Sequence, residues 1–269
     1  MRQRFFLIAS ILVVVLTGTG LWYALSRPQP ATQVSSGAAS TTPPLETSSS
    51  TSEANPKQAA PAVPSAFPIN SVDTLASWNF AGVDAGNAAL TAATDADRTK
   101  LTALLGKGQY DDYDLYIGLG NDANLEGDGS GAYMDYNKAA TIHSNKGLAY
   151  ENLGHLFDEL AAYHTAADAY AKAVRVEPSQ LQYHLSRLDF LVRRFGADNA
   201  RLTAAFADAH KQFGDSATIL IIKAQWFEGQ GRYADAITTL QTAKGLSSAD
   251  RQAAIDAQIA RDKAKLAAQ

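Results

Sequence analysis

The chain has 269 residues, with 23 Lys plus Arg against 27 Asp plus Glu, and it contains no cysteine. The absence of cysteine excludes disulfides, Cys-ligated zinc, iron–sulfur clusters and thiol nucleophiles. A formal net charge of -4 and a pI near 5.7 leave no excess of Lys and Arg to neutralise phosphates, which argues against a nucleic-acid-binding protein.

Residues 1–27 have the composition of a membrane anchor. After two arginines, the 21 residues from Phe5 to Leu25 carry no charge, and as a helix they would span about 31 Å, the thickness of a hydrocarbon core. The basic residues before this stretch place the N-terminus in the cytoplasm. A cleaved signal peptide is the alternative, because Ala24-Leu25-Ser26 has the small-x-small form of a cleavage site. Trp22 and Tyr23 suit an interfacial aromatic belt, so we favour a retained transmembrane signal anchor.

Residues 28–66 have the composition of a linker. They hold seven of the nine prolines and thirteen Ser or Thr, and no aromatic residue. Such a stretch cannot bury enough apolar surface to offset its ordering entropy, so we predict a disordered Ser/Thr/Pro/Ala linker. Together with the anchor, it predicts a single-pass membrane protein whose C-terminal part lies outside the cytoplasm, in a bacterial envelope.

Residues 67–112 are predicted to form an irregular N-terminal cap. The pattern indicates a helix from Thr94 to Leu105, with Thr94 or Asp95 as its N-cap. Trp78, Phe80 and Val83 are expected to pack on the helices that follow.

A regular pattern of small and bulky residues begins further along the chain. Between Gly147 and Gln180 it consists of Tyr150, Leu153, Gly154, Phe157, Tyr163, Ala166, Tyr170, Ala173 and Pro178. In spacing and residue type this resembles the tetratricopeptide repeat (TPR), in which an aromatic, Leu-Gly and an aromatic mark helix A, and Ala, an aromatic, Ala and Pro mark helix B. The main departure is Ala161, where the family usually has Gly at the turn between the two helices.

The same pattern recurs at fixed offsets. Subtracting 34 residues gives Tyr116, Leu119, Gly120, Gly127, Ala132, Tyr136, Ala139 and Ser144, and adding 70 gives Phe227, Gly231, Tyr233, Ala236, Leu240 and Ala243. The interval between is predicted to hold a degenerate unit, with a helix from about Gln180 to Phe195, a turn at 196–199 and a helix to about Phe213. We therefore expect four repeats over residues 113–250.

The resemblance implies an all-α fold, a right-handed αα-solenoid of about four TPR units that follows an N-terminal membrane helix and a disordered linker. A solenoid of this kind needs at least three repeats to bury its faces. Residues 251–269 carry Ile255, Ile259 and Leu266 among charged residues, and are predicted to form a helix that caps the last repeat.

Acidic residues near the first repeat could form a metal or catalytic site. Asp111, Asp112 and Asp114 stand where a helix begins, and negative groups there complement the helix dipole. The run from Asn121 to Asp128 resembles a calcium loop, but Tyr133 stands where the bidentate Glu is required. We therefore expect no catalytic residue, no metal and no cofactor.

The TPR resemblance does suggest a partner-binding groove. In the family, variable positions of each helix A face a groove that receives a peptide, and on this sequence those positions are polar to acidic. The expected partner-binding residues are Asn121, Asn124, Glu151, His155, Asp158, Glu159, Gln225 and Glu228. The net charge is -6 over residues 67–146 and zero over residues 147–269, which favours a partner with basic or hydrogen-bonding groups.

The resulting functional hypothesis is a scaffold without enzymatic activity. It would bind a protein or peptide partner in its groove, within an envelope-associated complex. Two alternatives stay open: a metal-dependent enzyme with ligands in the acidic region 111–135, and a structural protein that associates with itself. Nothing in the sequence identifies a small-molecule substrate.

Overall fold

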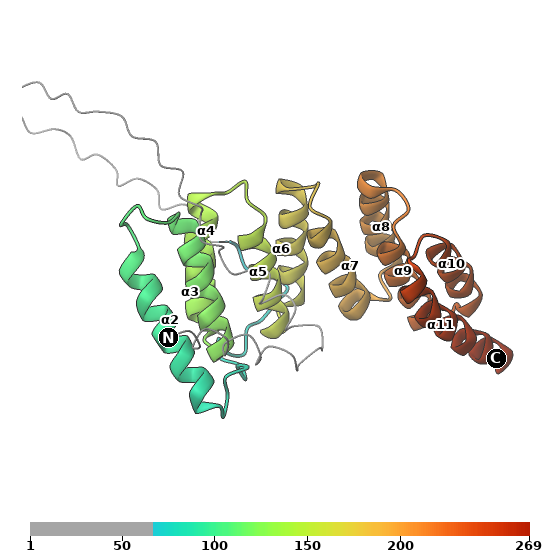
Figure 1. Ribbon diagram of the computed structural model, residues 1–269, viewed down its shortest axis with the longest axis horizontal. Coiled ribbons are helices and arrows are strands. Elements are labelled where there is room, and N and C mark those ends of the chain that lie inside the picture. Colours follow the sequence, from blue (N-terminus) through green and yellow to red (C-terminus); the bar gives the residue numbers. More distant parts are fainter. Residues whose placement is uncertain (1–66) are drawn as a thin grey trace, which may run out of the picture. The chain divides into compact units, whose positions relative to one another are not determined.

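The computed structural model describes residues 67–269, and in this part of the chain it contains ten α-helices and no strand (Figure 1). The helices are α2 (Ala88–Leu104), α3 (Asp112–Glu126), α4 (Gly129–Ile142), α5 (Leu148–Glu159), α6 (Tyr163–Val176), α7 (Leu181–Phe195), α8 (Asn199–Phe213), α9 (Ala217–Gly229), α10 (Tyr233–Gly245) and α11 (Ala249–Ala267). The all-α prediction is therefore confirmed for the described residues.

Three of the connections between helices have the same closed turn. Gly127, Ala161 and Gly231 each adopt a left-handed conformation, with φ of 79°, 57° and 71°. In each turn, the next residue donates its N–H to a carbonyl five positions back, in Ala123, Phe157 and Phe227. This is the Schellman arrangement, which satisfies carbonyl groups at the helix end and reverses the chain. The turns therefore recur at the offsets of 34 and 70 residues that the sequence pattern predicts.

Small residues let the paired helices approach closely. A Cβ atom placed on Gly120 would lie 2.4 Å from the ring of Tyr136, and one on Gly154 would lie 2.8 Å from the ring of Tyr170. Each pair joins the first helix of a hairpin to the second, and both tyrosines are fully buried. The helices therefore cross where one of them has no side chain.

The third hairpin, α7 with α8, departs from this scheme. Its turn contains Gly196 in the right-handed helical region, and Leu188 occupies the position equivalent to Gly154. Leu188 is nonetheless 1% exposed and belongs to the continuous core. The predicted helices of this degenerate unit are confirmed, since α7 and α8 end at Phe195 and Phe213.

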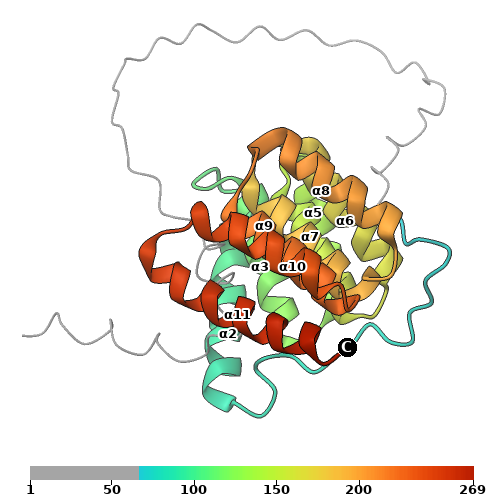
Figure 2. The same ribbon diagram turned by 90° about the vertical axis from the view of Figure 1, so that its right-hand side faces the viewer.

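Each helix packs against the helices next to it in sequence, as expected for a helical solenoid (Figures 1 and 2). The buried side chains form one core that continues from α3 to α11. α11 packs on α10 at the C-terminal end, and buries Ile255 and Ile259 as predicted. Leu266, in contrast, is 41% exposed and lies outside this core.

The segment before α2 runs along the hairpins as an extended strap, which we define as residues 67–87. Trp78 and Phe80 pack against the core as predicted, but Val83 is 68% exposed, which corrects the expected packing. The predicted helix start at Thr94 is also wrong. α2 begins at Ala88, because Asn87 accepts the N–H of Leu90 and provides the cap.

The predicted anchor (1–27) and linker (28–66) lie outside the described residues. Among the helices from 88 to 267, none is long and apolar enough to cross a membrane.

Candidate partner-binding surface

The eight residues predicted to bind a partner lie on α3, α5 and α9, which are first helices of hairpins. They divide into buried residues that hold the helices together and exposed residues that remain accessible. The neighbouring helix decides to which group each residue belongs.

On α3, Asn121 is 7% exposed and connects helices instead of facing solvent. Its Oδ1 accepts hydrogen bonds from the Tyr136 hydroxyl at 2.9 Å and from the Asn152 amide at 3.0 Å. Asn124 is half-buried on the same helix. Asn121 therefore joins α3 to α4 and α5, and offers almost no surface to a partner.

On α5, Glu151 and His155 are enclosed by the fold. Glu151 is 1% exposed and accepts a hydrogen bond from the Ser186 hydroxyl of α7 at 2.6 Å. The His155 ring packs edge-on against Tyr170, at 5.3 Å between ring centroids. Burial lowers the pKa of His155 to about 4, so this imidazole is neutral at pH 7. Glu151 thus belongs to the contact between α5 and α7, which corrects its expected place on an open groove.

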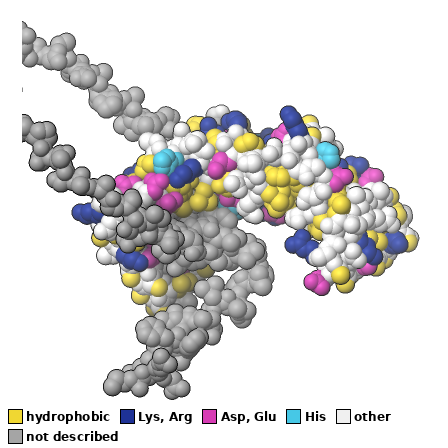
Figure 3. All heavy atoms as spheres, turned by 45° about the horizontal axis from the view of Figure 1, so that its top comes forward, with side chains coloured by type: hydrophobic (Ala, Val, Ile, Leu, Met, Phe, Trp, Pro, Cys, Tyr) yellow, Lys and Arg dark blue, Asp and Glu magenta, His cyan; other side chains and the backbone are white. Residues whose placement is uncertain are grey.

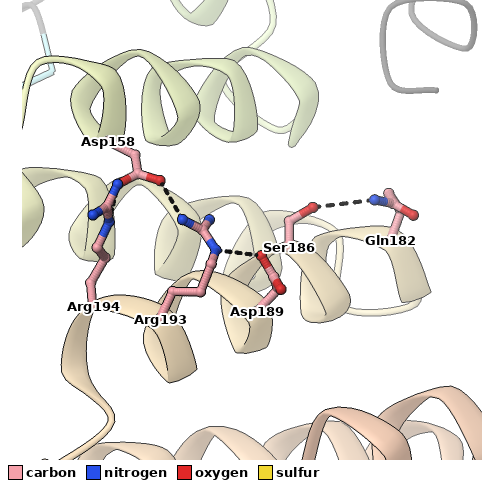
Figure 4. A network of polar contacts seen from close by, with 6 residues as sticks. All are labelled: Asp158, Gln182, Ser186, Asp189, Arg193 and Arg194. Carbon is pink, nitrogen blue, oxygen red and sulfur yellow. Dashed lines mark hydrogen bonds and ion pairs between the residues drawn. The ribbon is translucent and has the colours of Figure 1, made fainter. Parts of the chain in front are cut away.

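Asp158 is the centre of an ion-pair network between α5 and α7 (Figure 4). Its carboxylate accepts from Arg194 at 2.7 Å and from Arg193 at 3.2 Å. Arg193 also donates to Asp189, one turn earlier on α7, at 2.9 Å. The two arginines make the surface mixed in charge at this point, whereas the sequence predicts a polar to acidic one.

The other predicted residues differ in exposure. Glu159 and Gln225 are exposed, while Glu228 is half-buried beneath the last helix. Glu228 accepts a hydrogen bond from Gln258 and lies beside the buried carboxyl of Asp262. Burial, and then the charge and hydrogen bond of Glu228, raise the pKa of Asp262 to about 6. The capping helix therefore covers the last part of the predicted groove.

The sequence reasoning missed the residues of α7, because the third repeat is degenerate and no positions were carried onto it. Figure 4 shows them as a row that continues the surface from α5. Their spacing of four, three and four residues places them on one helix face, and this was the signal available in the sequence. These residues are Gln182, Ser186, Asp189 and Arg193, and together with Asp158 and Arg194 they form what we call the polar wall.

The acidic region 111–135 is helical for most of its length. Asp111 is the N-cap of α3 and accepts the N–H of Tyr113 at 3.0 Å, so its interpretation as a helix-end residue is confirmed. Within residues 67–269, no group of three or more His, Cys, Asp or Glu side chains is placed to hold a metal ion.

A second surface is covered by the chain itself. Phe67 at the start of the strap packs its ring on Tyr150 of α5, at 6.1 Å between centroids, and its carbonyl accepts from the Tyr133 hydroxyl of α4 at 2.8 Å. Its N–H donates to Asn137, also on α4. Asn70 then donates its N–H to Thr165 of α6 at 3.0 Å. This part of the strap lies over α5, between α4 and α6, in what we call the first groove.

The surface seen in Figure 3 carries interspersed charges of both signs, with no broad region of one sign. No protein-family model matches the chain, and no curated protein matches its sequence.

Proposed function

We propose that this chain is a TPR-type scaffold that binds a protein or peptide partner on the polar wall. Support for the TPR assignment comes from the three equivalent turns at Gly127, Ala161 and Gly231 and from the Gly–Tyr helix crossings. A solenoid of helical hairpins presents its first helices side by side, which creates an extended surface of the kind that binds peptides. A membrane-anchored position outside the cytoplasm rests on the sequence of residues 1–66.

One observation supports the proposed binding surface. The polar wall joins two successive first helices, α5 and α7, through the network of Asp158, Arg193 and Asp189. Arg193 and Asp189 are each about half-exposed, with side-chain exposures of 46% and 54%. Their charged groups are held in place by intramolecular bonds while their remaining donors and acceptors stay accessible. Such preorganised groups lose little rotamer freedom when a partner binds.

The chemistry of the wall favours an extended partner with both donors and acceptors. Gln182 and Ser186 offer neutral groups at one end, and Arg193 and Asp158 offer charged groups at the other. A partner with a single charge sign would meet a like charge on part of this surface, which costs affinity. An extended peptide with both donor and acceptor groups can form hydrogen bonds or ion pairs along the whole polar wall.

The test is crosslinking and capture with the full chain in solubilised membranes. The charge reversal Arg193→Glu, combined with Asp189→Lys, should lower recovery of a specific partner by about tenfold, since close charge pairs contribute more than 1 kcal/mol of coupling. The matched control is Arg175→Glu, an exposed arginine of α6 outside the wall. It should leave capture unchanged.

Circular dichroism melting of each variant separates loss of binding from loss of fold. If both variants capture the same partner as the unmodified chain, the polar wall is not the binding surface. If Arg175→Glu weakens capture while the wall variant does not, the partner binds the second helices of the hairpins instead.

A further inference from the structure

The position that the strap occupies in the first groove has a counterpart later in the fold. The segment Phe67–Asp73 lies over α5 between α4 and α6, and it contributes one aromatic side chain and one carboxylate to its contacts. The equivalent position later in the chain is an open groove of about 500 Å³, lined by α8, α9 and Arg232, the residue before α10. We call this cavity the second groove.

The equivalence follows from the helix positions. α8 begins at Asn199, 70 residues after α4 at Gly129, and α10 begins at Tyr233, 70 residues after α6 at Tyr163. The same offset carries the strap contacts Tyr133, Asn137 and Tyr150 to Thr203, Ala207 and Leu220. These three later residues line the second groove, whereas Asp235, the counterpart of Thr165, does not.

The second groove has an apolar floor. Phe206, Ile219, Trp226 and Phe227 line it, and each of them is less than 10% exposed. The rings of Phe206 and Trp226 stack at 5.6 Å between centroids. Thr203 and Ala207 are smaller than their counterparts Tyr133 and Asn137, so the wall formed by α8 leaves more space. A cavity of this volume is within the range of ligand sites.

The groove also carries cations that the first groove lacks at the same positions. Lys223 replaces Leu153, and Arg232 replaces Ala162. Both cations lie near the Phe227 ring, at 5.8 Å and 4.3 Å from its centroid. Arg232 is paired with Asp235, and His210 with Asp215. Within residues 67–269, Lys223 has no carboxylate at ion-pair distance, so its charge is available to an occupant.

We propose that the second groove binds an extended segment of a partner protein, in the manner in which the first groove binds the strap. The occupant places a bulky apolar side chain on the floor formed by Phe206, Ile219 and Trp226, and a carboxylate beside Lys223. Its carboxylate does not bind at the start of α10 in the way that Asp73 accepts the N–H of Thr165 at the start of α6. Asp235 replaces Thr165 there and would repel a second carboxylate. The second groove shares no residue with the polar wall, so an experiment can contradict one binding proposal and leave the other standing.

The probe is a labelled peptide with the sequence of residues 67–73, Phe-Pro-Ile-Asn-Ser-Val-Asp, and binding to the full chain is measured by fluorescence anisotropy. Lys223→Ala should weaken binding by about tenfold, the effect of removing one accessible charge pair on a partly apolar surface. Replacing the peptide's Asp with Asn should have the same effect, and the two changes together should not add.

A second variant fills the groove without removing a contact. Ala207 is exposed and lines the groove, so Ala207→Trp should block the peptide while the thermal melt stays unchanged. The matched control is Lys211→Ala, an exposed lysine of α8 that does not line the groove. It should change affinity by less than about twofold, as expected for a charge outside the contact.

Thr165→Val distinguishes the two grooves, because Thr165 contacts only the occupant of the first one. If Thr165→Val abolishes peptide binding and Lys223→Ala does not, the peptide displaces the strap and the proposal is overturned. Absence of binding at millimolar peptide also overturns it. Self-association of the full chain in light scattering that Ala207→Trp abolishes would identify the occupant as a second copy, against the proposed partner.

Discussion

The carboxylate of Asp73 accepts two hydrogen bonds from Thr165, one from the backbone N–H and one from the hydroxyl, each at 2.6 Å. The N–H of His164 donates to the same carboxylate at 3.2 Å. α6 begins after Ala162, whose side chain cannot accept a hydrogen bond, so α6 has no cap of its own. The strap therefore supplies the N-cap of α6 from 92 positions away in the sequence.

Removing this cap should destabilise the fold. Asp73→Ala is expected to lower the free energy of unfolding by about 1–2 kcal/mol, the usual value of an N-cap, as measured by urea denaturation at pH 7. Burial raises the pKa of Asp73, but the hydrogen bonds from Thr165 and His164 lower it more, so the net pKa is below 3.8. The contribution is therefore present above pH 3.8 and is lost as the pH falls through the lowered pKa. Asp95→Ala, at an exposed position of α2, should change stability by less than about 0.5 kcal/mol.

Gly127 is required both for its turn and for contact with the strap. Its φ is 79°, and a Cβ atom there would lie 2.2 Å from the carbonyl oxygen of Phe80. Gly127→Ala should lower the free energy of unfolding by about 3 kcal/mol or more, because backbone strain and a backbone clash add. Gly108→Ala is the control: its φ is 69° but its surroundings are open, so only the strain of about 1 kcal/mol should appear. Equal losses for the two variants would contradict the strap contact.

Ala161 is the one residue other than glycine in residues 67–269 with a positive φ, and it occupies the turn position that Gly127 and Gly231 fill in other hairpins. Ala161→Gly should therefore stabilise the fold by up to about 1 kcal/mol, after the greater freedom of glycine in the unfolded chain is included. The melting temperature should rise. Ala197→Gly, in the α7–α8 turn where φ is not positive, should lower it. A destabilising Ala161→Gly would contradict the left-handed turn.

His155 makes stability depend on pH. Its folded pKa of about 4 is below its ordinary value of 6.5, so the unfolded chain takes up the proton first as the pH falls. The free energy of unfolding should therefore decrease between pH 6.5 and pH 4, by at most about 3 kcal/mol from this residue. His155→Gln should flatten that decrease in a series of denaturation curves.

Asp262 should change the free energy of unfolding with pH in the direction opposite to His155, over a similar pH range. Its folded pKa of about 6 is above the ordinary 3.8, so the folded chain holds the proton more tightly and stability falls as the pH rises from 4 to 6. Asp262→Asn should raise the free energy of unfolding at pH 8 by about 1–3 kcal/mol, with little effect at pH 4. Asp256→Asn should instead lower it slightly at pH 8, by up to about 1 kcal/mol, since Asp256 pairs with Lys244 at the surface.

Local regularities made much of the fold predictable. Side chains three and four positions apart share a helix face, so small and bulky residues at regular spacings predict helices. Gly154 and Tyr170, with their counterparts Gly120 and Tyr136 34 positions earlier, marked the two helices of each hairpin. Turns are also local, and the glycines at 127 and 231 mark them. The limits were the strap, which has no period, and the start of α2. This helix begins six residues before its expected start, because Asn87 is its cap.

The partner-binding residues could be predicted only in part. Their positions on α3, α5 and α9 follow from the repeat, but their exposure depends on which side chains the next hairpin brings against them. Ser186 buries Glu151, Arg193 and Arg194 neutralise Asp158, and Gln258 covers Glu228. The degenerate third repeat concealed most of these partners in the sequence.

The sequence by itself determined that residues 113–250 form helical hairpins joined by tight turns, because helix periodicity and left-handed turn residues act within a few positions of the chain. The tertiary structure decided what covers each hairpin, because the strap reaches α6 across 92 positions and a groove exists only where separate helices meet. Contacts over such distances depend on the geometry of packing, to which no local pattern of residues corresponds.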